Sequence, residues 1–145
     1  MKILARILAM SALVLVMGSC DDDDEDNSQN MTTFSTALTG DNEVPPNDSD
    51  AQGIATLLFN ENTGKFNLSV SYSGITATDA HIHKGGVGES GPAVFPIPVT
   101  ASPLVLTNVD LTAQQEADLK NGLYYVNIHS AEYPNGEIRG QLTED

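Results

Sequence analysis

Short stretches of the chain alternate between apolar and polar residues. The clearest is 65–72, in which Phe66, Leu68, Val70 and Tyr72 are separated by polar residues. Because successive side chains on a strand point to opposite sides, this alternation predicts a half-buried β-strand. Similar alternation, or enrichment in β-branched and aromatic residues, predicts further strands at 33–39, 53–59, 80–84, 93–99, 104–106, 123–130 and 137–142.

Turn residues and prolines divide these strands. The segments 60–64 and 133–136 are rich in Asn, Gly and Pro, so both are predicted to be turns. Pro96 and Pro98 lack a backbone N–H, which restricts 93–99 to a sheet edge or a bulge.

One segment departs from the alternation and predicts a helix. Thr112 and Gln115 fit a capping box, with Thr112 as the N-cap residue and Gln115 at position N3. Asn121 and Gly122 are typical of a helix end. We expect a helix of about two to three turns across one end of the sheets.

Together, about seven or eight short strands without a strand–helix rhythm predict an all-β domain, an antiparallel sandwich or flattened barrel with one short helix. The domain spans 31–145, a length suited to a single core.

The first residues are typical of a secretory signal peptide. Lys2 and Arg6 are followed by an apolar run at 7–17. This run is shorter than the roughly 20 apolar residues that a membrane-spanning helix needs. We therefore expect residues 1–19 to be a signal peptide that is removed on export.

Cys20 is the only cysteine of the chain, so no disulfide can form within it. Gly18 and Ser19 directly before it resemble the lipobox of bacterial lipoproteins. The resemblance implies that Cys20 is acylated and anchors the protein in a membrane, with the outer membrane of the cell envelope as its expected location. The alternative is an incidental cysteine beside an uncleaved anchor.

An acidic segment follows Cys20. Residues 21–26 are all Asp or Glu, and the net charge of the chain is −14. Repulsion between like charges predicts a disordered tether over 20–30. Acidic residues at this place also resemble surface-export signals of some Gram-negative lipoproteins. The charge argues against a nucleic-acid partner and favours cations or basic protein surfaces.

Histidines are the main candidates for chemistry. The chain has three, and strand alternation puts His81 and His83 on one face, while His129 shares a face with Tyr125 and Asn127 away from the core. If the two strands are neighbours, three imidazoles converge, a ligand set that suits zinc or copper. The alternative is that they are structural, hydrogen-bonded histidines.

Glu137 and Arg139 also share a strand face. They are expected to form an exposed charge pair at a sheet edge, with an accessory role beside the histidines as the alternative. We find no catalytic constellation, because the chain lacks a Gly-X-Ser-X-Gly sequence and Cys20 is blocked if acylated. The glycine-rich stretch 84–88 is predicted to be a mobile loop and not a phosphate-binding loop.

Several motifs follow one another along the chain. They are FSTALTG (34–40), NEVPP (42–46), AQG (51–53), AHIHKG (80–85), LTAQQEADL (111–119), YYVNIH (124–129) and PNGEIRGQL (134–142). Together and in this order they resemble the CHRD (chordin) domain over 33–142. The family occurs in chordin, an animal antagonist of bone morphogenetic proteins, and in many exported bacterial proteins. The resemblance implies a fold and a compartment more than an activity.

A second resemblance concerns the metal hypothesis. His81 and His83, then His129, then Arg139 are similar in order to three copper-ligand histidines and the active-site arginine of copper/zinc superoxide dismutases. Those enzymes are Greek-key β-sandwiches, so the resemblance implies a Greek-key fold, superoxide-dismutase-like or immunoglobulin-like. The segment between His83 and His129 contains no histidine, so the bridging ligand and the zinc site of those enzymes are missing.

We therefore expect an exported, membrane-anchored CHRD-domain lipoprotein. Its expected role is that of a non-catalytic binding or structural module at the cell envelope, with a protein or glycan partner at the cell surface. The alternative is a copper- or zinc-binding protein that uses His81, His83 and His129 in metal handling or redox protection.

Overall fold

The computed structural model describes residues 30–145 as an all-β domain of nine strands, one α-helix and one short 3-10 helix. The predicted signal peptide, lipidated Cys20 and nearly all of the tether lie outside the described residues. The strands are β1 (Met31–Thr39), β2 (Gln52–Asn60), β3 (Lys65–Ser73), β4 (Ala77–Lys84), β5 (Ala93–Pro96), β6 (Leu104–Asp110), β7 (Tyr124–Ser130), β8 (Ile138–Gln141) and β9 (Thr143–Glu144); the helices are η1 (Gly40–Asn42) and α1 (Ala113–Lys120).

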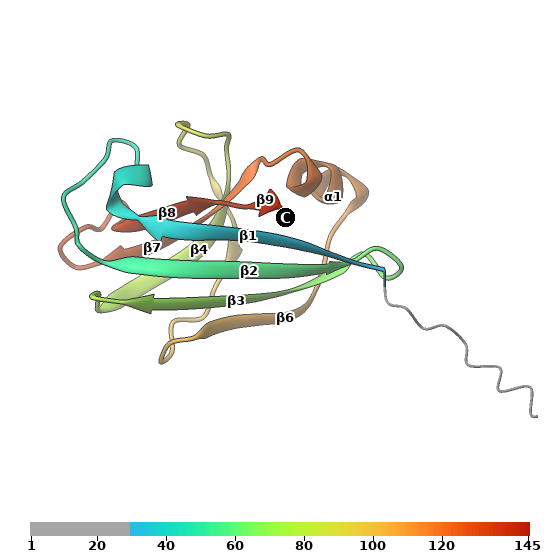
Figure 1. Ribbon diagram of the computed structural model, residues 1–145, viewed down its shortest axis with the longest axis horizontal. Helices are drawn as coiled ribbons and strands as arrows, with labels where there is room; N and C mark the ends of the chain where they lie inside the picture. Colours follow the sequence, from blue (N-terminus) through green and yellow to red (C-terminus); the bar gives the residue numbers. More distant parts are fainter. Residues whose placement is uncertain (1–29) are drawn as a thin grey trace, which may run out of the picture.

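All strand pairs are antiparallel, in the order β5-β4-β7-β8-β1-β2-β3-β6, and β9 pairs with β1. The sheet curls over on itself, so that β1, β2, β3 and β6 face β4, β7 and β8 across the core (Figure 1). The connections β3 to β4, β5 to β6 and β6 to β7 cross between the two halves, as in Greek-key folds. This arrangement confirms the predicted all-β, antiparallel sandwich class.

Apolar residues of the two halves meet in one core. Phe34, Leu57 and Phe66 come from β1, β2 and β3, while Val126 and Ile128 come from β7, and all are fully buried. These are the apolar positions of the alternating segments, so the sheet forms because each strand needs the opposite half to cover one face.

The helix α1 begins and ends where the sequence predicts. The backbone N–H of Gln115 donates to Thr112 Oγ1 at 3.3 Å, and the backbone N–H of Thr112 donates to Gln115 Oε1 at 2.9 Å, which completes the capping box. The helix lies across one end of the curled sheet (Figure 1). No helix in the described part of the chain is long and apolar enough to cross a membrane.

Two loops cover the outer face of β7 and β8, which the alternation of the sequence assigns to the side away from the core. Tyr125 and Asn127 point to this outer face but are only 2 % and 4 % exposed. Gly91 and Glu43, from the loops after β4 and η1, form hydrogen bonds with them. A second, polar buried layer therefore lies outside the sheet.

Candidate metal centre

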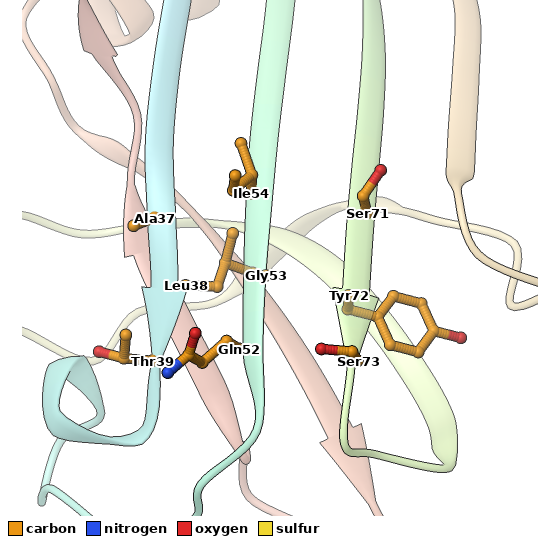
Figure 2. A pocket seen from close by; sticks show the side chains of 9 residues that line it. All are labelled: Ala37, Leu38, Thr39, Gln52, Gly53, Ile54, Ser71, Tyr72 and Ser73. Carbon is orange, nitrogen blue, oxygen red and sulfur yellow. The ribbon is translucent and has the colours of Figure 1, made fainter.

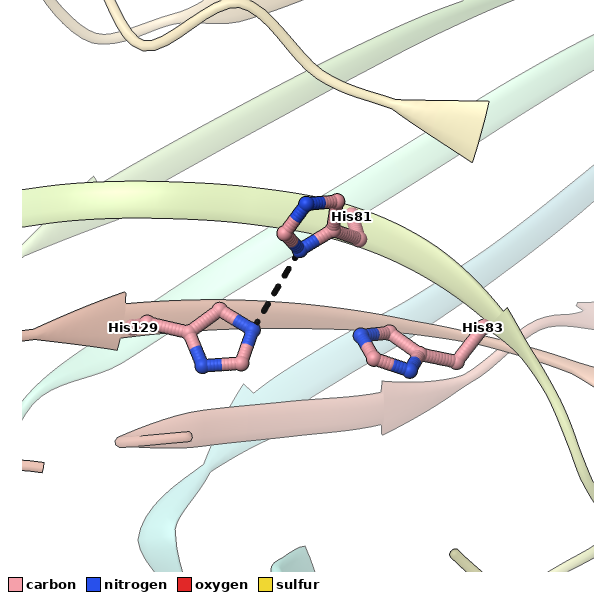
Figure 3. A group of neighbouring side chains, drawn as sticks. All are labelled: His81, His83 and His129. Atoms are coloured by element: carbon pink, nitrogen blue, oxygen red, sulfur yellow. Dashed lines mark hydrogen bonds between the residues drawn. The ribbon is translucent and has the colours of Figure 1, made fainter. Parts of the chain in front are cut away.

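The three histidines converge at the junction of β4 and β7. His81 and His83 are two residues apart on β4, and β7 runs beside it so that His129 pairs with Asp79. The Nδ1 atom of His81 lies 3.4 Å from the Nε2 atom of His129, and one ring nitrogen from each histidine lies within 4.8 Å of the other two (Figure 3). The predicted convergence of the imidazoles is present; the metal itself stays a prediction.

The spacing of the ring nitrogens suits a metal ion. Two imidazole nitrogens bound to zinc at about 2.0–2.1 Å in a tetrahedron lie about 3.4 Å apart. The distance between His81 Nδ1 and His129 Nε2 is 3.4 Å. Side chains therefore need to move little to accept an ion among the three rings.

In His83 and His129, the ring nitrogen that points away from the other histidines donates a hydrogen bond to a backbone carbonyl. The Nδ1–H of His83 donates to the carbonyl of Gly91 at 2.9 Å, and the Nδ1–H of His129 donates to the carbonyl of Pro134 at 3.1 Å. A carbonyl can only accept, so the Nε2 atom of each neutral ring keeps its lone pair. Metal-binding histidines usually make this kind of outer hydrogen bond.

The protonation of the rings favours binding of a cation. Burial lowers the pKa of His83 and the pKa of His129 below the usual range of histidine, and it outweighs the hydrogen bonds to the carbonyls, which act in the opposite direction. Both rings are therefore neutral at neutral pH, the form in which imidazole binds a metal.

His81 makes a different set of contacts. Because His129 Nε2 accepts, the Nδ1–H of His81 donates to it, and the Nε2 atom of His81 lies 3.4 Å from Asp79 Oδ1. An ion among the rings would take the place of the Nδ1 proton. Asp79 is the carboxylate that could then accept a hydrogen bond from a protonated Nε2.

Arg139 lies beside the cluster but does not pair with Glu137. Its guanidinium lies 3.5 Å from the centre of the Tyr125 ring, and that ring stacks on His83 with the centroids 5.0 Å apart. Glu137 accepts a hydrogen bond from Ser49 Oγ at 2.6 Å. The expected exposed pair at a sheet edge is wrong because β8 lies between β7 and β1, and both side chains are buried.

Sequence reasoning placed Tyr125 on the face of His129 without giving it a role, and it missed three further residues around the site. Asp79 follows the same alternation as His81 and His83, so extending that pattern would have found it. Gly91 and Glu43 enter from loops, and no local pattern marks them. Glu43 is 7 % exposed, accepts from Asn127 Nδ2 at 3.3 Å, and has its pKa raised by burial to about 7.

A model of the CHRD domain family matches residues 34–142. The chain belongs to the CHRD domain family. No curated protein and no solved structure matches the chain. All three histidines and Arg139 lie inside the matched CHRD region. Family membership supports a binding or structural module, and it assigns no ligand.

The CHRD domain also carries a shallow hollow on the other half of the sheet. Its volume is about 480 Å³. It lies over β2, between residues of β1 and β3 on either side (Figure 2). No histidine, carboxylate or amine lines it, so it offers no metal ligand. The lining residues are Ala37, Leu38, Thr39, Gln52, Gly53, Ile54, Ser71, Tyr72 and Ser73.

Proposed function

We propose that the protein is a non-catalytic metal-binding module of the cell envelope, which holds one copper or zinc ion through His81, His83 and His129. The observation that carries the proposal is the convergence of three ring nitrogens, one from each histidine. In His83 and His129 the other ring nitrogen, Nδ1, donates to a backbone carbonyl. This is the outer hydrogen bonding that orients metal ligands in proteins.

The bonding of His83 favours a ligand over a purely structural histidine. Its Nε2 atom is buried and has no hydrogen-bond partner among the described residues. Buried polar atoms in folded proteins nearly always have a partner, so an unpartnered one calls for an explanation. An ion bound between the three rings supplies the missing partner.

The ligand types narrow the choice of metal. Imidazole nitrogens suit zinc and copper, whereas calcium and magnesium prefer oxygen ligands. With three protein ligands, a fourth position stays open for water or a small ligand. When bound, the ion would supply a positive charge and an exchangeable coordination position; the role is binding and handling of the metal.

The proposed location rests on the sequence. A signal peptide over 1–19, an acylated Cys20 and an acidic tether over 20–30 would hold the domain at the outer membrane of the envelope. Acyl chains contribute roughly 0.8 kcal/mol per buried CH₂, enough for a durable anchor when two or more are present. Other partners would be proteins or glycans at the cell surface.

Calorimetric titration with copper and zinc tests the metal site. Residues 30–145 contain the whole sheet and its core, and they leave out the six carboxylates of 21–26, which would bind cations unspecifically. We expect about one ion per chain, bound tightly. The control replaces His81, His83 and His129 by Ala, which removes every imidazole of the chain.

Loss of the tight binding in this variant, with its circular dichroism unchanged, would support the site. Equal and weak binding by both proteins would overturn it. The anchor is tested separately: Cys20→Ala in the full chain should move the protein from the membrane fraction to the soluble fraction.

A further inference from the structure

The glycine-rich segment 85–91 is held down by side chains of β8. Arg139 Nη2 donates to the carbonyls of Gly86 and Glu89 at 3.0 Å and 2.8 Å. Gln141 Nε2 donates to the carbonyl of Gly85 at 2.9 Å. The loop that the sequence predicts to be mobile therefore has three of its carbonyls bonded to the neighbouring strand.

The end of the segment is fixed where it meets His83. The backbone N–H of Gly91 donates to the hydroxyl of Tyr125 at 3.1 Å. A Cβ on Gly91 would lie only 1.6 Å from the carbonyl oxygen of Lys84, so the backbone packs as closely as glycine allows. The Gly91 carbonyl that accepts from His83 therefore lies in a closely packed part of the backbone.

Tyr125 connects the arginine with the histidine. The strand β7 lies between β4 and β8, so His83 and Arg139 reach the Tyr125 ring from the strands on either side. The imidazole stacks on the ring at an interplanar angle of 12°, and the guanidinium lies 3.5 Å from the ring centre. Stacking of a planar guanidinium on an aromatic face is favourable, and lysine cannot reproduce it.

We propose that Arg139 is a positioning residue that keeps His83 in the form able to bind a metal. It holds the segment 85–91 and the Tyr125 ring, and these two fix the proton of His83 on Nδ1 and leave Nε2 free toward His81 and His129. The role in metal binding rests on the proposed function; the effect on His83 can be measured without a metal.

The physical reason is preorganisation. Which imidazole nitrogen carries the proton depends on the hydrogen bond that the other makes. If the Gly91 carbonyl moves away, the proton of His83 is free to occupy Nε2 and block the ligand atom. Arg139 donates to both carbonyls through Nη2, and the same planar group stacks on the Tyr125 ring. The ammonium group of lysine has no plane that can stack on the ring while it holds the carbonyls.

The test is the imidazole ¹⁵N spectrum of the metal-free protein, recorded at one fixed pH of about 8 for wild type and Arg139→Lys. At that pH ordinary histidine is neutral, so the shifts report the tautomer. Wild type should show Nδ1–H for His83 and for His129. In the variant, His83 should become a mixture of tautomers.

His129 is the internal control, because its proton is held by Pro134 in a different turn. Its spectrum should not change. Arg139→Lys should also weaken metal binding by roughly 10–100-fold, the usual effect of removing an outer partner. Val87→Ala at the loop tip, where the side chain is 83 % exposed, should leave both measurements unchanged.

An unchanged His83 tautomer in folded Arg139→Lys would overturn the proposal. If wild type shows the expected tautomers, the variant loses them, and neither binds metal, then the positioning role holds and the proposed function fails. If the variant does not fold, the proposal is tested by NMR on the wild-type protein alone. Its Arg139 guanidinium protons should exchange slowly with solvent and show nuclear Overhauser contacts to the Tyr125 ring. Absence of both would overturn the proposal.

Discussion

Asp79 is the carboxylate closest to the outer nitrogen of His81. Its Oδ1 atom lies 3.4 Å from His81 Nε2, while its own side chain is 62 % exposed. If an ion binds at Nδ1 of His81, the proton of the neutral ring must reside on Nε2, where Asp79 can accept it. The carboxylate then orients the ring and raises its basicity.

We therefore expect Asp79→Asn to lower the affinity for copper or zinc by roughly tenfold. The free energy of unfolding without metal should change little, because an exposed carboxylate beside a histidine contributes little to stability. Calorimetric titration measures the first quantity and urea denaturation the second. An affinity equal to that of wild type would show that Asp79 does not support the ligand.

Glu43 and Asn127 form a buried pair with two oxygen atoms that lack partners. Asn127 Nδ2 donates to Glu43 Oε2, but Glu43 Oε1 and Asn127 Oδ1 have no hydrogen-bond partner among the described residues. Burial raises the pKa of Glu43 to about 7, although the charge of Arg139 acts in the opposite direction. A protonated Glu43 is itself a donor, and Asn127 Oδ1 is an acceptor beside it.

This pair makes stability depend on pH. The pKa of Glu43 is about 7 in the folded protein and near its ordinary value of 4.5 in the unfolded chain. Between these values the folded state binds more protons, so the stability that the protonated carboxyl contributes falls as the pH rises. Glu43→Gln keeps a donor and an acceptor at all pH values.

We expect wild type to lose ~2 kcal/mol of unfolding free energy relative to Glu43→Gln between about pH 5 and about pH 8. Urea denaturation of both proteins at the two pH values measures the difference, and contributions of the histidines cancel in it. A difference that does not vary with pH would mean that Glu43 titrates normally.

At the scale of elements, the segment after β4 depends on close backbone packing at Gly91. A Cβ there would meet the Lys84 carbonyl at 1.6 Å, whereas a Cβ on Gly86 would meet only the flexible end of Glu89, at 3.2 Å. The two glycines therefore differ in what alanine would do, although they lie in the same loop.

Gly91→Ala should destabilise the domain by ~1–3 kcal/mol, because the backbone must move away from β4. It should also weaken metal binding, since the moving carbonyl is the acceptor for His83. Gly86→Ala is the matched control and should change either quantity only slightly. Thermal unfolding and calorimetric titration of the two variants provide the comparison.

Local patterns predicted most elements because local physics determines them. Period-two alternation or β-branched and aromatic residues located the strands from β1 to β8, the prolines put β5 at an edge, and the capping box located α1. The strand β9, with two residues, and the short η1 were missed because they are too brief for a periodic pattern. The burial of the outer face was also missed, because it depends on loops far away in the sequence.

In the candidate site, too, local patterns predicted the residues on strands but not the contacts from loops. Alternation put His81 and His83 on one face and indicated that His129 would join them if the two strands were neighbours. The structure pairs the strands and brings the three rings together. It could not predict the carbonyls of Gly91 and Pro134, because turns and loops carry no fixed register. Metal binding and the lipid on Cys20 stay predictions.

For the whole molecule, metal binding should couple to folding. The ligands come from β4 and β7, strands separated by about forty residues of chain, so the site exists only in the folded state. At a free zinc concentration of about 100 times Kd, the free energy of unfolding should rise by about 2.7 kcal/mol. Urea denaturation with and without zinc measures this increase.

The variant with His81, His83 and His129 replaced by Ala should gain nothing from zinc. A similar gain in this variant would mean that zinc stabilises the fold at another place, and the three-histidine centre would then not be the cause.

The register of β1 would have a consequence if Cys20 carries the proposed lipid. The chain enters the sheet at Met31, and the far end of β1, at Thr39, pairs with Arg139. Arg139 pairs with Asn127, which pairs with His81, so the histidines lie level with the end of β1 that is farther from Met31. Eight strand residues correspond to about 26 Å.

That length is about three times the Debye length of roughly 8 Å in physiological salt, so the charge of lipid headgroups would be screened at the histidines. An N-terminal lipid would thus leave the site open to the surrounding fluid. The protein would sample ions dissolved around the cell, at their bulk concentration, and not those enriched at the bilayer surface.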